Sequence, residues 1–362
     1  MRNALAILSI LVTAIATLTV SRLSYGYFYS EEVEKAEGRL SLYQASVSSE
    51  LERFSHLTYV LARDPFLIAT AEGGPTAALN LRLRQFSERA GLDAIYLMGE
   101  DGVTIAASNA GEAASFVGQD YSFRPYFQTA LDGTQGRFYG IGATTGLPGY
   151  FIADLVRDPA DDPVGVVAIK IDLTKLQDVW RDSGERVFLA NADGVVLLSS
   201  DQAWLYRTLD ALTRDQRTRI DASRQFPGQA LAPLDWSRDG RGRAMIAGGE
   251  WVHLTTDALP HGWELHYFAS DDRATALSLL VTAAIVILAG LALVLYQIQR
   301  ARRTAAALRR SESEEAELRR ANEQLAREIE DRRRAERRLK RTQDELERAG
   351  RLAALGRLSA SV

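Results

Sequence analysis

One uninterrupted apolar segment constrains this chain more than any other feature. Residues Ala274 to Ile298 contain no charged side chain, and a helix of that length is long enough to cross the hydrocarbon core of a membrane. Arg300, Arg302 and Arg303 follow directly, and such positive flanks stay on the cytoplasmic side. We therefore predict a transmembrane helix at 273–298. The alternative is a buried core helix.

A shorter apolar segment lies at the start of the chain. Residues Ala4 to Val20 are almost wholly apolar, and aromatic residues suited to a membrane interface follow between Tyr25 and Tyr29. We predict a first transmembrane helix within 1–28, although a cleaved signal peptide is the alternative reading. Two spans would place the chain between them outside the membrane.

A long amphipathic helix is predicted after the first span, over residues 29–63. Its apolar residues recur at steps of three and four: Val33, Ala36, Leu40, Tyr43, Val47, Leu51, Phe54, Leu57 and Leu61. Asp64-Pro65 should end this helix, because the residue before proline is pushed out of the helical region. The apolar face could pack on its own domain or pair with its copy in a homodimer, and both readings stay open.

An internal repeat indicates a duplicated domain. The segment from Ala94 to Ser108 aligns without a gap with the segment from Arg186 to Ser200. Each reads as a strand, an Asp-Gly turn and a second strand, and glycine accepts the positive φ of such turns. We predict two similar α/β sensor domains in series, a membrane-distal one at 64–181 and a membrane-proximal one at 182–272.

The last part of the chain, residues 299–362, reads as a charged helix. It carries a net charge of about +6, which leaves about −10 for everything before it. Leu318, Leu325, Leu339 and Leu346 lie on a seven-residue grid, which favours a weak parallel coiled coil over a solvated single helix. Aromatic residues are not interleaved with its basic ones, so nucleic-acid binding is not expected.

Several chemistries are disfavoured by composition. The chain has no cysteine and four histidines, with no HExxH pattern, so we expect neither a catalytic residue nor a metal site. No glycine-rich nucleotide cradle is visible. We therefore predict no cofactor in these residues.

The stretch between residues 119 and 170 carries the features of an anion pocket. Arg124 lies among aromatic and hydroxyl side chains, and Lys170 interrupts the apolar strand pattern from Val166 to Ile171. A buried cation needs an anion, and no acidic residue interrupts that strand, so we predict that the anion is a ligand. Side chains alternate along a strand, which places Lys170 on one face with Val166 and Ala168. A surface arginine and an edge-strand lysine are the alternative readings.

Hydroxyls and glycines complete the predicted pocket. The predicted ligand-binding residues are Tyr121, Ser122, Arg124, Thr144, Lys170, Tyr139, Gly142, Thr145 and Tyr150. Gly140, Gly146 and Gly149 would let the backbone approach a ligand closely. A second cationic anchor favours a small dianion over an amino acid, which needs an acidic group for its ammonium. Asp154 is a candidate for that acidic group, so an amino-acid ligand stays open.

At these residues the chain resembles the four-carbon dicarboxylate sensor histidine kinases of the DctB type. The resemblance rests on four segments: Asp120-Tyr-Ser-Phe-Arg-Pro-Tyr-Phe127, Phe138-Tyr-Gly-Ile-Gly-Ala-Thr-Thr145, Pro148-Gly-Tyr150 and Val167-Ala-Ile-Lys-Ile-Asp172. It implies two tandem PAS-like (double Cache) periplasmic domains between two spans of the bacterial inner membrane. It also implies that Tyr121, Ser122, Arg124, Thr144 and Lys170 bind succinate, fumarate or malate.

The same resemblance implies an output and partners. A homodimeric receptor would control an autophosphorylating histidine kinase and a response regulator. The tail from Gly350 to Val362 resembles the run before the phospho-acceptor histidine, and none of the four histidines matches that position. ATP and Mg²⁺ are therefore expected only in a kinase domain outside these residues. A chemoreceptor or cyclase output, or a structural membrane-anchored coiled-coil protein, are the alternatives. The proximal domain has no comparable pair of cations and is expected to be empty or structural.

Overall fold

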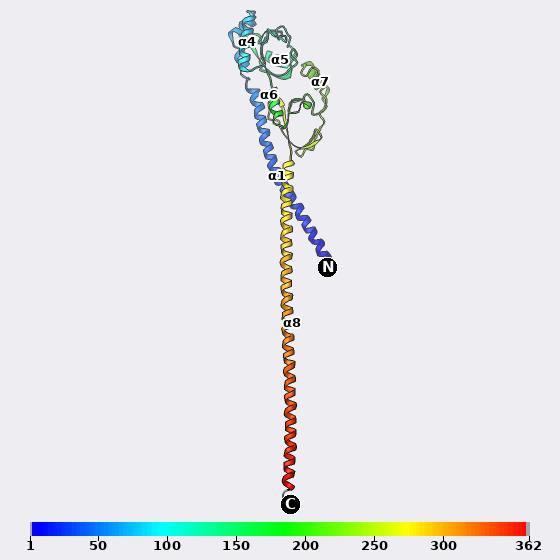
Figure 1. The fold of residues 1–362 in the computed structure, drawn as a ribbon. Coiled ribbons are helices and arrows are strands. Elements are labelled where there is room, and N and C mark those ends of the chain that lie inside the picture. Colours follow the sequence, from blue (N-terminus) through cyan, green and yellow to red (C-terminus); the bar gives the residue numbers. More distant parts are fainter. Residues whose placement is uncertain (1, 360–362) are drawn as a thin grey trace. The chain divides into compact units, whose positions relative to one another are not determined.

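The computed structural model describes the backbone of residues 2–359 and the side chains of residues 11–350. The chain divides into two units, residues 1–280 and residues 281–362. The first contains helix α1 and two sheets, and the second consists of the continuation of helix α8 (Asp272–Ser359) (Figure 1). The mixture of helices and sheets agrees with the predicted α/β (α+β) class.

The membrane-distal domain is built on a five-stranded antiparallel sheet with the strand order β2-β1-β5-β4-β3. Its strands are β1 (Ala94–Met98), β2 (Thr104–Ala107), β3 (Gly136–Ile141), β4 (Pro148–Arg157) and β5 (Pro163–Ile171). Helices α2 (Leu57–Leu61), α3 (Pro65–Ala71) and α4 (Thr76–Ala90) pack on one face, and α5 (Pro125–Leu131) packs on the other. The sheet therefore separates two apolar clusters, and the cluster under α5 contains the predicted pocket.

The membrane-proximal domain contains a six-stranded sheet with the order β7-β6-β11-β10-β9-β8. Its strands are β6 (Arg186–Ala190), β7 (Val196–Ser199), β8 (Trp236–Arg238), β9 (Arg243–Ile246), β10 (Gly249–Thr256) and β11 (Glu264–Ala269). Its helical elements are α6 (Thr174–Asp182), η1 (Gln202–Trp204), α7 (Arg214–Ala222) and η2 (Pro260–Gly262). The strands of both sheets fall within the two predicted ranges, 64–181 and 182–272.

The predicted internal repeat is visible as matching strand orders. Strands β1 and β2 occupy the places that β6 and β7 occupy in the second sheet. Gly102 and Gly194 both have a positive φ, +83° and +77°, in equivalent turns. The Ser108 hydroxyl accepts a hydrogen bond from the Ile95 amide at 3.0 Å, and the Ser200 hydroxyl accepts one from the Val187 amide at 3.1 Å. The duplication therefore extends to individual hydrogen bonds.

Helix α1 (Arg2–Glu52) differs from the prediction in its end point. The helix ends at Glu52, about ten residues earlier than expected, and the chain turns before α2. Asp64-Pro65 begins a helix in place of ending one, because the Asp64 carboxylate accepts hydrogen bonds from the Phe66 and Leu67 amides at 2.9 and 3.4 Å. Proline at the first helical position loses no hydrogen bond.

The apolar face of α1 packs on its own domains. Its buried residues are Ala36, Leu40, Val47 and Leu51, and they join the main core together with Tyr43. Helix α1 contacts strands β10 and β11. The reading in which this face packs on its own chain is therefore confirmed, and pairing with a second copy stays a prediction.

By length and composition alone, α8 is the one helix among the described residues that could cross a membrane. Its most apolar window has a mean hydropathy of 2.8. The first predicted span, Ala4 to Val20, begins among residues whose side chains lie outside the described part, and the predicted tail motif at 350–362 also runs beyond it. The heptad leucines Leu318, Leu325, Leu339 and Leu346 are exposed in the single chain.

The two turn glycines offer a matched test of the duplication. An alanine at either position must adopt a positive φ, which costs about 1–2 kcal/mol. At Gly102 the new Cβ would also lie 2.6 Å from the Ser122 amide nitrogen, whereas at Gly194 its nearest neighbour is at 3.6 Å. We expect Gly102→Ala to lower the free energy of unfolding more than Gly194→Ala, measured by urea denaturation of the full chain. Equal losses would contradict the close packing of this turn against residue 122.

Candidate ligand-binding site

Arg124 is the N-cap residue of α5, and its side chain lies inside the protein at 1% exposure. Its Nη1 donates hydrogen bonds to the carbonyl oxygens of Ser223 and Arg224, both at 3.1 Å, and its Nη2 donates to the Ile141 carbonyl at 2.8 Å. Among the described residues Arg124 forms no ion pair. Burial lowers the pKa of the Arg124 guanidinium below its ordinary value. A buried positive charge without a carboxylate favours an anionic ligand.

A small cavity adjoins Arg124 beneath α5. It is lined by Tyr96, Phe116, Tyr121, Arg124, Tyr126, Gly142, Ala143, Thr144 and Phe151 and has a volume of about 10 Å³. That volume holds about one water molecule. The aromatic side chains fill the remaining space, and the Tyr96 hydroxyl donates to the Tyr126 hydroxyl at 2.7 Å. The pocket is closed in this structure, so a dicarboxylate would enter only after it opens.

The loop between β3 and β4 lines the cavity and contacts both Tyr121 and Lys170. The hydroxyls of Thr144 and Tyr121 lie 2.6 Å apart, and the Thr145 hydroxyl lies 3.5 Å from Lys170 Nζ. Gly142 lies close to the rest of this loop, because a Cβ there would be 2.6 Å from Thr145 Oγ1 and 3.2 Å from the Leu147 carbonyl oxygen. Adjacent threonines thus contact both halves of the predicted pocket.

Lys170 lies on the predicted face of β5, beside Phe151 of β4 in the sheet register. Its side chain is fully buried and forms an ion pair with Asp93, which precedes β1. The Asp93 amide also donates to the Lys170 carbonyl at 3.0 Å. Gly149 leaves room for the lysine stem, because a Cβ there would lie 2.5 Å from Lys170 Cε. Asp93 is therefore the acidic partner that the sequence analysis missed.

Not every predicted site residue reaches this face. Tyr139 and Tyr150 belong to the core on the opposite side of the sheet, so this structure does not bring them to the cavity beside Arg124. Their role as ligand contacts stays a prediction. The Tyr139 hydroxyl donates to the Leu197 carbonyl at 2.8 Å, and the Tyr150 hydroxyl lies 2.7 Å from His261 Nε2. Both tyrosines therefore form hydrogen bonds with residues of the proximal domain. Along their strands, residues 139 and 150 alternate with Phe138 and Phe151, which face the cluster under α5.

Asp154 also lies away from the pocket. Its carboxylate accepts hydrogen bonds from the Thr58 hydroxyl at 2.6 Å and from Gln135 Nε2 at 2.9 Å, on the side where α2 packs. Ser122 lies beside the Gly102 turn, and its amide donates to the Asp120 carboxylate at 2.8 Å. The structure thus brings Tyr121, Arg124, Gly142 and Thr144 together around the cavity, with Thr145 and Lys170 alongside.

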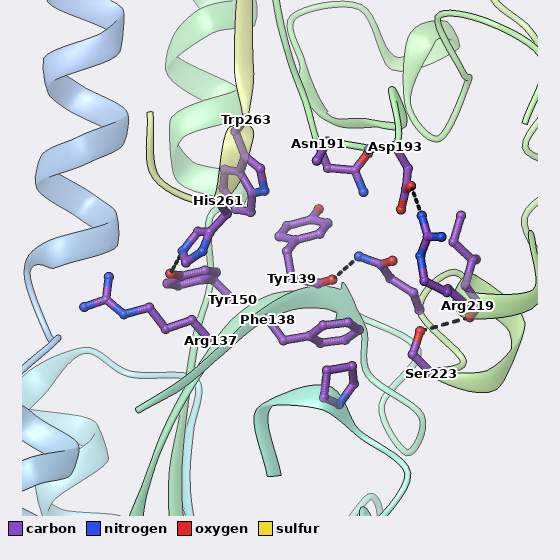
Figure 2. A pocket seen from close by; sticks show the side chains of 14 residues that line it. Arg137, Phe138, Tyr139, Tyr150, Asn191, Asp193, Arg219, Ser223, His261 and Trp263 are labelled. Atoms are coloured by element: carbon purple, nitrogen blue, oxygen red, sulfur yellow. Dashed lines mark hydrogen bonds and ion pairs between the residues drawn. The ribbon is translucent and has the colours of Figure 1, made fainter. Parts of the chain in front are cut away.

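A larger cavity lies between the two sensor domains (Figure 2). Its volume is about 290 Å³, and its lining includes Tyr139, Tyr150, Arg219, Gln225 and His261. Its polar groups largely satisfy one another, since Arg219 pairs with Asp193 at 2.8 Å and Tyr150 bonds His261. The lining carries no unpaired buried charge, in contrast to Arg124.

The proximal domain has no cation at the position of Lys170. Aligning the repeats by register places Phe268 of β11 at that position and His253 of β10 at the position of Phe151. Phe188, Trp204, His266 and other aromatic residues fill the corresponding space. The two domains therefore differ at this position, where the distal domain has a buried lysine and the proximal domain has aromatic packing.

Comparison with known proteins agrees with these features. The chain is 32% identical over 353 residues to the C4-dicarboxylate transport sensor protein DctB of Pseudomonas aeruginosa, covering 92% of this chain and 56% of the relative. It is 29% identical to the protein of the same name from Rhizobium meliloti, covering 89% and 56%. The predicted resemblance to DctB-type sensors is confirmed. The chain spans about half the length of these curated relatives. No protein-family model matches the chain.

Solved structures support the fold. The V. cholerae histidine kinase DctB sensor domain superposes with a TM-score of 0.60 at 22% identity, covering 67% of this chain and 98% of that domain. The sensory domain of the Campylobacter jejuni chemoreceptor Tlp3 gives a TM-score of 0.51 at 12% identity, covering 70% and 99%. The predicted arrangement of two tandem sensor domains is therefore confirmed.

The proximal core predicts a pH-dependent stability. His253 and His266 are buried with Nε2 and Nδ1 3.0 Å apart, near Arg238 and Glu264. Burial lowers the pKa of His253 to about 4 and that of His266 to about 3. The unfolded chain, with an ordinary histidine pKa of about 6.5, then binds more protons, so stability is full above pH 6.5 and falls below it.

Between pH 7 and 5 we expect each histidine to cost about 2 kcal/mol of unfolding free energy. Urea denaturation of the full chain at a series of pH values measures this loss. His253→Gln should remove about 2 kcal/mol of this loss, and His261, whose pKa is also lowered by burial, contributes to the remainder. His56→Gln, at an exposed position, is the control. A flat profile from pH 7 to 5 would contradict the neutral buried pair.

Proposed function

We propose that this chain is the sensing part of a transmembrane two-component receptor for extracytoplasmic C4 dicarboxylates, with the ligand bound in the distal domain. The observation that carries the proposal is the buried Arg124 guanidinium, which has neutral carbonyl acceptors and no carboxylate partner. The similarity to proteins named C4-dicarboxylate transport sensors supports the choice of ligand.

A small dianion would bind both buried cations, Arg124 and Lys170, and would compete with Asp93 for the second. One carboxylate would bind Arg124 through two charge-assisted hydrogen bonds. The other would bind Lys170, with the hydroxyls of Tyr121 and Thr144 as further donors. Because the cavity is closed, binding requires α5 and the β3–β4 loop to separate. The ligand then stabilises whichever conformation it binds more tightly than the closed, empty one.

The proposed setting follows from the apolar segments and the relatives. The two sensor domains would lie on the periplasmic side of the inner membrane, and α8 would cross it. Strand β11 is followed directly by α8, so a change in the proximal domain would reach the cytoplasmic helix along the chain. In a homodimer these helices would control a histidine kinase and, through it, a response regulator, with ATP and Mg²⁺ bound in the kinase part.

An amino-acid ligand is the second candidate, and Asp93 favours it. This carboxylate lies against Lys170 and is partly exposed, so it could accept a ligand ammonium while Arg124 binds the carboxylate. Asp93 thereby takes the role that the sequence analysis gave to Asp154.

Removing either cation should abolish high-affinity binding. We expect Arg124→Ala and Lys170→Ala to weaken succinate binding by at least about tenfold each, because each loses charge-assisted hydrogen bonds of about 1.5–3 kcal/mol. Isothermal titration of the detergent-solubilised full chain measures this. The exposed Arg89→Ala and Lys175→Ala variants are matched controls and should bind as the wild type does. Unchanged affinity in the first pair would overturn the site assignment.

Asp93→Asn separates the two ligand classes. For a dicarboxylate, losing the carboxylate that competes for Lys170 should strengthen binding about fivefold, a value reduced for its partial exposure. For an amino acid, losing the ammonium partner should weaken binding by a similar factor. Titrations with succinate and with a panel of amino acids distinguish these outcomes, and the exposed Asp132→Asn controls for net charge. Weaker succinate binding in Asp93→Asn would argue against the dianion.

A further inference from the structure

The end of α7, in the proximal domain, forms hydrogen bonds with Arg124, the main residue of the proposed distal site. Two of the three carbonyl oxygens that bind Arg124 belong to Ser223 and Arg224, directly after α7. These carbonyls lie at the negative end of the helix dipole, which suits a guanidinium. An arginine of one domain therefore caps a helix of the other.

The donor inventory of Arg124 leaves a definite set of free groups. A guanidinium has five N–H donors in a fixed plane. Both donors of Nη1 are directed to Ser223 and Arg224, and one donor of Nη2 is directed to Ile141. The donors that remain are Nε–H and one Nη2–H, and neighbouring donors of this kind can bind a carboxylate in bidentate fashion. The contacts with α7 thus fix the arginine without using up its capacity for a ligand.

The same short segment is tied to the edge of the distal sheet. The Gln225 carbonyl accepts a hydrogen bond from the Ile141 amide at 2.9 Å. Gln225 Nε2 donates to the Tyr139 carbonyl at 2.8 Å, the bond drawn beside Tyr139 in Figure 2. Arg224 has a φ of +48°, a costly conformation for a non-glycine residue. The strained residue is thus one of the two whose carbonyl oxygens accept hydrogen bonds from Arg124.

We propose that residues 223–225 at the end of α7 are a positioning element of the distal ligand site. Their carbonyl oxygens fix the orientation of the Arg124 guanidinium and leave its Nε–H available to a ligand. The ligand therefore binds best when the two domains are in contact. By thermodynamic reciprocity, ligand binding then strengthens the docking. The inference rests on the proposed function, because it names how that site is built and how occupancy reaches the proximal domain.

Gln225→Ala tests the inference without touching the cavity, since Gln225 lines the interdomain cavity and not the one beside Arg124. The variant removes the side-chain hydrogen bond to β3. We expect succinate affinity, measured by titration of the full chain in detergent, to fall about three- to tenfold, the value of one hydrogen bond. Gln135→Ala is the matched control, because it removes hydrogen bonds with Ser55, Arg137 and Asp154 and none with residues 223–225. Its affinity should stay within about twofold of wild type.

Hydrogen exchange supplies a readout that simple destabilisation does not move. Succinate should slow exchange of the Ile141 and Gln225 amides, which lie at the junction, and Gln225→Ala should diminish this protection. Faster exchange at both amides on adding succinate, or Gln225→Ala binding as tightly as wild type, would overturn the coupling alone. A wild-type chain that binds no succinate would overturn the proposed function and the coupling with it.

Discussion

The buried charge of Arg124 is the interaction on which the sensor depends. Neutral carbonyl oxygens satisfy three of its donors, but they do not compensate a positive charge removed from water. This uncompensated charge is the basis of the proposed anion site. The three carbonyls come from Ile141 at the end of β3 and from the end of α7, so the proposed site shares Arg124 with the junction between the two domains.

The duplication explains why the two domains have different roles. Both copies share the strand order, the turn glycines Gly102 and Gly194, and the serines Ser108 and Ser200, whose hydroxyls accept hydrogen bonds from strand amides. In the distal copy the aromatic core beneath α5 also contains the buried cations Arg124 and Lys170. In the proximal copy Phe268 takes the place of Lys170, and aromatic packing fills the space. The distal copy therefore carries the proposed binding site, and the proximal copy leads through β11 into α8.

Local patterns in the sequence predicted much of this architecture. The repeat, the apolar segment before Arg300 and the strand face of Lys170 all depend on periodicity within a few residues, which a sequence records directly. The partner of Lys170 was missed because Asp93 meets it only through the pairing of β1 with β5. The α7 carbonyls at Arg124 were missed because backbone acceptors carry no side-chain signal. Tyr139 and Tyr150 lie on the opposite face of the sheet from Arg124 because side chains alternate along a strand, which a list of hydroxyl groups does not take into account.

A crystal structure of the sensor domains grown with succinate tests the central claim most directly. We predict one carboxylate bound to Nε and Nη2 of Arg124, the other beside Lys170, and the contacts between Arg124 and residues 223–224 retained. Succinate in the interdomain cavity with the distal cavity still closed would contradict the account. So would a distal ligand that has displaced Arg124 from α7.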